Sequence, residues 1–182
     1  MNFKTVADLN SQIEMISSAP KDSAPITKLC YRPGFGQRVY PDTLTLSVED
    51  GVIGDRWKQA AWLRLENGVP DPRIQVCILP QRVLDLVWTQ GSAEPYPGDT
   101  MIADMDTSYH NMPVGTILQA GSAQLQVSDV FNDGCTKWAA RYGADSREWI
   151  NLPQNRPLRL RGILCQIVSD GVVQLGDVLR KV

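Results

Sequence analysis

Short runs of alternating or β-branched residues, separated by glycine, aspartate and proline, fill most of this sequence. At residues 43–48 the alternation is strict, and it predicts that Leu44, Leu46 and Val48 share one buried face. Many short strands with turn residues between them are typical of a β-barrel or a β-sandwich. The predicted strands are 26–31, 43–48, 74–79, 116–119, 123–130, 162–168, 172–174 and 178–180. Asp170-Gly171 predicts a tight hairpin turn in which glycine supplies a positive φ.

Helices are expected at few places. Thr5 is a candidate cap for an N-terminal helix whose apolar positions follow helical spacing, and this helix should end before Pro20. Residues 21–25 read as a linker, so the predicted organisation is a helix and linker over 1–24 and a barrel over 25–182. Other helices are predicted from Pro80 to a stop at Gly91, over 136–142 with an end at Gly143, and through Ile150 with Asp145 or Ser146 as cap.

Composition excludes several classes of protein. The 182 residues carry a formal net charge of -2, and lysine and arginine are scattered, which argues against a nucleic-acid binder. No apolar run approaches the roughly 20 residues of a membrane helix, and no secretory signal opens the sequence. The expected location is the cytoplasm.

The four cysteines fall into two groups. Cys30, Cys77 and Cys165 lie inside predicted strands, where a cysteine usually packs as a small hydrophobe. No C-x-x-C pair occurs and His110 is the only histidine, so a structural zinc site is not expected. His110 lies in a polar loop and reads as a surface residue.

Cys135 differs because it follows a predicted strand and begins a predicted helix. Helix N-terminal amides and the downstream Lys137 and Arg141 favour a thiolate, which is the nucleophile, sulfur acceptor and soft metal ligand. Asp133 opposes this effect by adding negative charge beside the sulfur. From position alone, both a reactive Cys135 and an inert loop cysteine stay open.

An ordered set of motifs surrounds Cys135. The set comprises Gly54-Asp55-Arg56, Arg73-Ile74-Gln75-Val76, Pro97-Gly98-Asp99, Val114-Gly115-Thr116, Gly121-Ser122-Ala123, Gly134-Cys135-Thr136-Lys137-Trp138, Arg141-Tyr142-Gly143, Asn151, Leu160-Arg161-Gly162-Ile163, Gly171-Val172-Val173 and Gly176-Asp177-Val178. In this order the motifs resemble a free-standing, bacterial-type MOSC domain, the family named for the C-terminal part of molybdenum-cofactor sulfurases. The resemblance runs from about Pro25 to Val182.

The resemblance implies a mainly β, closed barrel that binds the molybdenum cofactor (molybdopterin) or carries its terminal sulfur. Cys135 would be the metal ligand, the persulfide carrier and, in an enzyme, the catalytic residue. Some relatives form part of a molybdenum reductase of N-hydroxylated compounds, which requires an electron-transfer partner. Others follow a pyridoxal-phosphate-dependent desulfurase, so here pyridoxal phosphate would belong to a sulfur donor protein.

Further candidates suit an anionic pterin-phosphate ligand because they supply charge-assisted donors. They are Arg56, Arg73, Lys137, Arg141 and Arg161. A solvated face is the alternative for Arg56, Lys137 and Arg141, whereas for Arg73 and Arg161 a structural ion pair is favoured over a ligand contact. Asp99 is placed beside the ligand through its motif, and Asn132 stands where many members of the family have a histidine.

Two other functions compete with this reading. One is a non-catalytic barrel that binds a small ligand or a partner protein and uses its cysteines only for packing. The other is a thiol redox sensor based on Cys135. The sequence leaves the substrate, the oligomeric state and the question of catalysis open.

Overall fold

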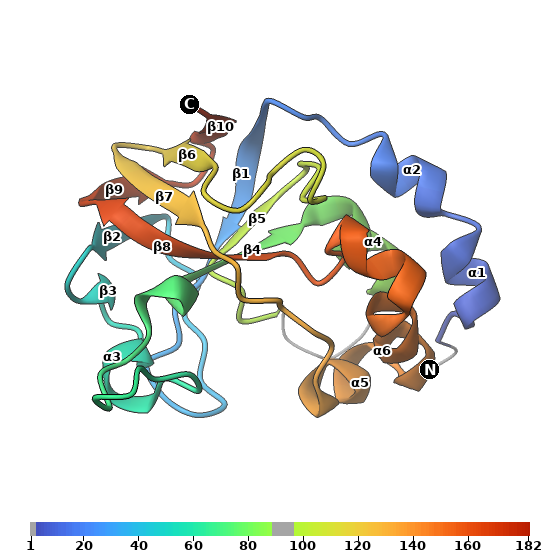
Figure 1. Cartoon of the computed structure of the whole chain (residues 1–182), viewed down its shortest axis with the longest axis horizontal. Coiled ribbons are helices and arrows are strands. Elements are labelled where there is room, and N and C mark those ends of the chain that lie inside the picture. The colour runs from blue at the N-terminus through green and yellow to red at the C-terminus, as the bar shows by residue number, and fades with distance from the viewer. Residues whose placement is uncertain (1–2, 89–96) are drawn as a thin grey trace.

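A seven-stranded closed barrel forms the centre of the computed structural model, which describes residues 3–88 and 97–182 (Figure 1). Around the barrel the order is β1 (Ser23–Leu29), β10 (Val178–Lys181), β6 (Ile117–Ala120), β7 (Ala123–Val127), β8 (Ile163–Ser169), β4 (Val76–Pro80) and β5 (Met101–Ala103). Neighbours are antiparallel except β4 and β5, which run parallel. The predicted closed, mainly β barrel is confirmed.

A smaller sheet packs on the barrel in the order β3 (Gly51–Val52), β2 (Thr43–Ser47) and β9 (Gly171–Gln174). Leu44 and Leu46 join the apolar cluster of the barrel interior, as predicted. Val48 does not, because β2 ends at Ser47 and the Val48 side chain is 44% exposed. The strict sequence alternation therefore extends one residue beyond the strand.

The predicted hairpin at Asp170-Gly171 is wrong. β8 pairs with β7 and β4, whereas β9 pairs with β2, so the chain leaves the barrel for the smaller sheet at this point. A Cβ on Gly171 would lie 2.4 Å from the Ala123 backbone nitrogen. Glycine is needed here because two backbones approach closely, and not because a turn needs a positive φ.

The N-terminal segment forms two short helices, α1 (Val6–Asn10) and α2 (Ile13–Ser17), where one continuous helix was expected. The predicted cap is confirmed: the Thr5 hydroxyl accepts from the Asp8 amide at 3.2 Å, and the Thr5 amide donates to the Asp8 carboxylate at 3.0 Å. β1 begins at Ser23, inside the expected linker, because Ser23 pairs with Arg180 of β10.

Four further helices are α3 (Trp57–Ala60), α4 (Gln81–Val87), α5 (Thr136–Tyr142) and α6 (Ala144–Asn151). Two 3-10 segments cover Pro72–Ile74 and Pro153–Leu158. α5 has the predicted bounds and ends at Gly143, whose φ is 90°. Gly143 also caps α6, so the predicted cap by Asp145 or Ser146 is wrong. α4 begins after Pro80, which is its N-cap, and it ends at Val87 because Trp88 is already extended. The helix is therefore shorter than expected, and the expected stop at Gly91 lies outside the described residues.

Helices α1, α2, α5 and α6 gather on one side of the barrel (Figure 1). Their buried side chains share one apolar cluster with α4, which includes Leu9, Ile16, Trp138 and Trp149. Burial in this common layer stabilises short helices that would not persist alone in water. Cys135 lies at the start of α5, one of the helices of this layer.

Candidate functional site

Cys135 is an exposed free thiol at the N-cap position of α5. Its backbone is extended, and its carbonyl accepts from the Trp138 and Ala139 amides at 3.1 and 3.2 Å, which closes the first helical turn. Its side chain makes no capping hydrogen bond. The thiol is therefore held on a fixed backbone while the sulfur stays accessible.

The turn before Cys135 is fastened to α6 through Gly134. The Gly134 amide donates to Asn151 Oδ1 at 2.9 Å, and its carbonyl accepts from Asn151 Nδ2 at 3.1 Å and from Arg147 Nε at 3.0 Å. A Cβ on Gly134 would lie 2.6 Å from Ile150 Cδ1. This glycine lets the thiol-bearing turn lie directly on the helix.

Next to this turn, three buried polar side chains meet at the parallel strands β4 and β5. The Cys77 thiol donates to Asp99 Oδ1 at 2.8 Å, and Arg161 Nη1 donates to the same oxygen at 2.6 Å. The Cys77 amide also donates to the Thr100 hydroxyl at 3.2 Å. We call Cys77, Asp99 and Arg161 the thiol–carboxylate–guanidinium cluster.

The chain around Cys135 contacts this cluster on both sides. Three residues before Cys135, Asn132 Nδ2 donates to the Arg161 carbonyl at 2.9 Å and to Cys77 Sγ at 3.2 Å. Three residues after it, the Trp138 ring lies 4.8 Å below the Arg161 guanidinium carbon. Arg161 is thus attached to both flanks of Cys135.

Several buried polar atoms near this cluster have no hydrogen-bond partner among the described residues. They are Asp99 Oδ2, Arg161 Nε, Arg38 Nε, Arg141 Nε and the Tyr142 hydroxyl, with Arg56 Nε and Trp149 Nε1 elsewhere. The charges of Asp99, Arg161 and Arg38 all act on the Tyr142 hydroxyl, so these four groups are neighbours. Unsatisfied buried donors are costly in a folded protein, and they commonly mark a site that binds something.

Burial raises the pKa of the three buried thiols. Burial and then Asp99 raise the pKa of Cys77 well above its ordinary value, so this thiol stays protonated and can donate to Asp99. Burial also raises the pKa of Cys30 to about 11 and that of Cys165 to about 12. Burial alone would lower the pKa of Arg161, but the charge of Asp99 raises it above its ordinary value. Arg161 therefore stays charged, with its Nη1 4.0 Å from the Cys77 sulfur.

The Gly54-Asp55-Arg56 motif contacts a further arginine, Arg32. Asp55 is buried and accepts from the Arg32 amide at 2.7 Å, from Arg32 Nε at 3.0 Å and from the Trp57 amide at 2.9 Å. Arg56 stacks on the Phe35 ring at 4.4 Å and lines a hollow of about 320 Å³. Burial, then repulsion from Arg32, lowers the pKa of Arg56. Asp99 and Cys77 also act on Arg32, so Arg32 connects this motif to the cluster.

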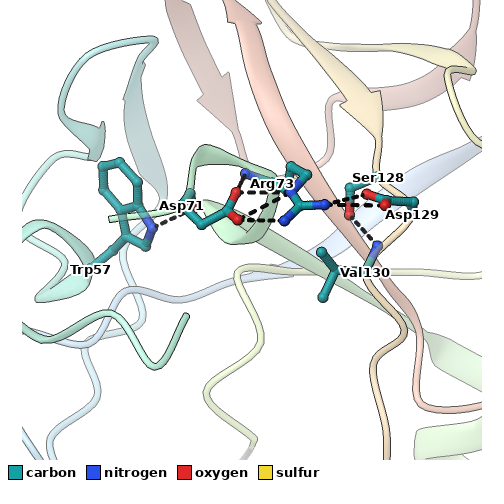
Figure 2. A network of polar contacts seen from close by, with 6 residues as sticks. All are labelled: Trp57, Asp71, Arg73, Ser128, Asp129 and Val130. Atoms are coloured by element: carbon teal, nitrogen blue, oxygen red, sulfur yellow. Dashed lines mark hydrogen bonds and ion pairs between the residues drawn. The ribbon is translucent and has the colours of Figure 1, made fainter. Parts of the chain in front are cut away.

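Arg73 has a different environment, which Figure 2 shows. Its Nε and Nη2 donate to the buried Asp71 at 2.7–3.1 Å, and its Nη1 donates to both oxygens of Asp129 at 3.0 and 3.1 Å. The Asp71 carbonyl accepts from Trp57 Nε1 at 3.2 Å. Two carboxylates thus occupy the guanidinium, which is the structural ion pair that the sequence favoured for this residue.

Of the residues predicted for the site, the structure links Asp99, Asn132 and Arg161 directly. Cys135 is connected to them through its chain neighbours Asn132 and Trp138, which contact Arg161. Lys137 is exposed in the first turn of α5, and Arg141, half-buried in the last turn, has an unpartnered Nε. Arg56 is near the cluster only through Arg32, and Arg73 is engaged elsewhere. Among the described residues, no group of three acidic, histidine or cysteine side chains could hold a metal ion.

Sequence reasoning missed Cys77, Arg32 and Arg38. Cys77 was read as a strand hydrophobe, and β4 is indeed buried along its whole length. Its neighbours Val76 and Ile78 belong to the barrel interior, whereas Cys77 faces outward with Trp57 and Leu164. The missing signal was the parallel pairing of β4 with β5, which brings Asp99 to Cys77 from 22 residues away.

Comparison with known proteins supports the fold. No family model and no curated sequence matches this chain. Several solved structures are similar to it. One, described as a hypothetical protein, has 22% identity and a TM-score of 0.57, and the match covers 87% of this chain and 68% of that one. YiiM from Escherichia coli has 21% identity and a TM-score of 0.57 over 88% of this chain and 69% of its own, and YuaD from Bacillus subtilis has 14% identity and a TM-score of 0.56 over 86% and 94%. At these identities the likeness shows the fold alone, and the closed barrel agrees with the fold that the motifs implied.

No helix in the described part of the chain combines the length and the apolar character that crossing a membrane requires.

Proposed function

We propose that this protein binds the molybdenum cofactor or carries sulfur for it, and that Cys135 is the residue that bonds molybdenum or sulfur. The observation that carries this proposal is an exposed thiol on a fixed turn, with a residue on each side of it, Asn132 and Trp138, in contact with Arg161. Thiolate is the form of cysteine that accepts sulfur and binds soft metals. A cysteine used only for packing would be buried, as the other three are.

The polar atoms around Cys135 suit an anionic pterin-phosphate ligand. Arg161, Arg141 and Arg38 each present a buried Nε that has no partner among the described residues. These donors would hold phosphate or pterin oxygens by charge-assisted hydrogen bonds. The bound cofactor would supply two-electron oxygen-atom chemistry at the metal. Lys137, Asn132 and Arg56 are further candidates at the margin, and Arg73 is the weakest because carboxylates already occupy it.

Partners follow from this chemistry. A persulfide on Cys135 requires a sulfur donor protein, and a pyridoxal-phosphate reaction would take place in that donor. Reduction of an N-hydroxylated substrate would require an electron-transfer partner, since the metal must be re-reduced after each turnover. We place the protein in the cytoplasm, where such partners and free thiols are maintained.

The test is the molybdenum and pterin content of the purified protein, with mass spectrometry of Cys135 for a persulfide. Wild type should carry metal or persulfide, and Cys135→Ala should carry neither. Cys30→Ala is the matched control and should behave as wild type, because Cys30 is buried. Absence of both species from wild type, even after incubation with cofactor or a sulfur donor, would instead favour a non-catalytic barrel with structural cysteines.

A further inference from the structure

Arg161 lies beside the Cys77 thiol and contacts residues on both sides of Cys135. The Cys77 sulfur lies 4.0 Å from Arg161 Nη1, and Arg161 is attached to both flanks of Cys135 through Asn132 and Trp138. One thiol is buried and the other is exposed. Any change in how Arg161 is held is therefore transmitted to the segment that carries the exposed thiol.

The ion pair that holds Arg161 is incomplete. Arginine and a buried carboxylate commonly pair through two parallel hydrogen bonds. Here only Nη1 and Oδ1 are joined, and Asp99 Oδ2 has no partner among the described residues. Asp99 is 3% exposed, so bulk solvent does not compete with Arg161 for its carboxylate. Something holds the two groups out of the two-point geometry.

The Cys77 thiol is the group placed to do this. It donates to Asp99 Oδ1, the oxygen that Arg161 also uses, and its sulfur accepts from Asn132. Two donors on one oxygen fix the carboxylate in one orientation, which leaves Oδ2 turned away from the guanidinium. An apolar side chain at position 77 would not supply this hydrogen bond, and a serine would.

We propose that Cys77 is a positioning residue: its thiol orients Asp99 so that Arg161 stays directed toward the Cys135 segment and is not drawn fully onto Asp99. This inference rests on the proposed function for its biological meaning, since it assigns Cys77 to the tuning of the Cys135 site. Cys77 itself bonds neither sulfur nor metal. Its effect is to set how much of the Arg161 charge acts at Cys135.

The measurement is the charge selectivity of Cys135 alkylation, defined as the ratio of its rates with anionic iodoacetate and neutral iodoacetamide at one fixed pH. A positive charge near the sulfur raises this ratio, and loss of bulk packing alone does not. Arg161→Met should lower it about three- to fivefold. Cys77→Ala should lower it in the same direction, because Asp99 then binds Arg161 through both oxygens. Cys77→Ser should restore it.

Two further variants keep the test decisive. Asp99→Asn preserves shape and removes the competing charge, so the ratio should rise above that of wild type. In an Arg161→Met background, Cys77→Ala should have no further effect, since the two substitutions act through one group. Cys165→Ala, which removes a buried thiol elsewhere in the barrel, is the packing control.

The proposal is overturned if Cys77→Ala, or Asp99→Asn where the alanine variant does not fold, leaves the ratio unchanged while Arg161→Met lowers it. It is also overturned if Arg161→Met has no effect, because Arg161 would then not act on Cys135. Neither result affects the molybdenum and persulfide content of wild type. Failure of the positioning role and failure of the proposed function are thus distinguishable.

Discussion

Two arginine–aspartate networks in this protein have opposite degrees of completeness. Arg73 places all three of its donating nitrogens on two carboxylates, Asp71 and Asp129 (Figure 2). Arg161 donates to Asp99 through one nitrogen, and its buried Nε has no partner among the described residues. The sequence favoured the same use, a structural ion pair, for both arginines.

The difference shows how to separate a structural ion pair from a site. A saturated network has no capacity left for a ligand, and its residues connect parts of the fold. An unsaturated buried network retains hydrogen-bonding capacity that evolution normally removes from a protein interior. Only the Arg161 network adjoins an exposed thiol, and there the argument for binding chemistry is strongest.

The largest expected contrast concerns thiol reactivity beside the two networks. Alkylation of the folded protein at pH 8 should modify Cys135 at least about a hundredfold faster than Cys77, because Cys77 is buried and protonated. Cys30 and Cys165 should be protected in the same way. Peptide mass spectrometry over time checks this. Comparable labelling of Cys77 and Cys135 would mean that the Arg161 network is open to solvent.

Removal of the buried Asp99 carboxylate should destabilise the protein more than removal of the half-buried Asp104 carboxylate. Asp99→Ala leaves the largely buried Arg161 without a counter-charge, and we expect a loss of about 2–4 kcal/mol in the free energy of unfolding. Urea unfolding measures this against Asp104→Ala, which removes the partner of the half-buried Arg82. A loss below about 1 kcal/mol would indicate that Arg161 is hydrated.

Asp71 should contribute stability that depends on pH. The hydrogen bonds from Arg73 hold the pKa of this carboxyl below its ordinary value of 3.8. A depressed pKa stabilises the folded state above that value, and the gain is lost as pH falls through the folded pKa. The free energy of unfolding, measured by urea unfolding, should therefore be about 1–2 kcal/mol larger for wild type than for Asp71→Asn at pH 7. This difference should disappear below about pH 4. A gap that widened at low pH would contradict this account.

The smallest effect is expected at Asp129. Its side chain is 60% exposed and it binds an arginine that is itself 41% exposed, so Asp129→Ala should cost about 0.2–1 kcal/mol. Thermal unfolding at low and high salt checks this, since a surface pair should weaken with salt. A loss above about 2 kcal/mol would mean that Asp129 is essential to the order of the Arg73 network.

Local patterns predicted much of the fold. The bounds of α5 and its end at Gly143 were readable because helix periodicity and glycine termination act within a few residues. Positions of most barrel strands were readable for the same reason. Strand pairing was not: Asp170-Gly171 resembles a hairpin turn, yet β9 pairs with β2, and only the tertiary approach of Ala123 explains the glycine.

The candidate site was predictable in part. Cys135 stood out because its position between a strand and a helix is a local feature. Cys77 did not, because its role comes from Asp99 and Arg161, which the barrel brings together from distant positions. Asn132 was placed near the cysteine by the motif, and the structure adds that its amide joins Arg161 to Cys77.

The most direct test of the central claim is the amount of molybdenum cofactor bound per chain after anaerobic incubation, compared among wild type, Cys135→Ala and Asp129→Ala. We predict close to one cofactor per chain for wild type and for Asp129→Ala, and almost none for Cys135→Ala. Equal binding by wild type and Cys135→Ala, or no binding by wild type, would contradict the assignment of the site to Cys135 and the Arg161 network.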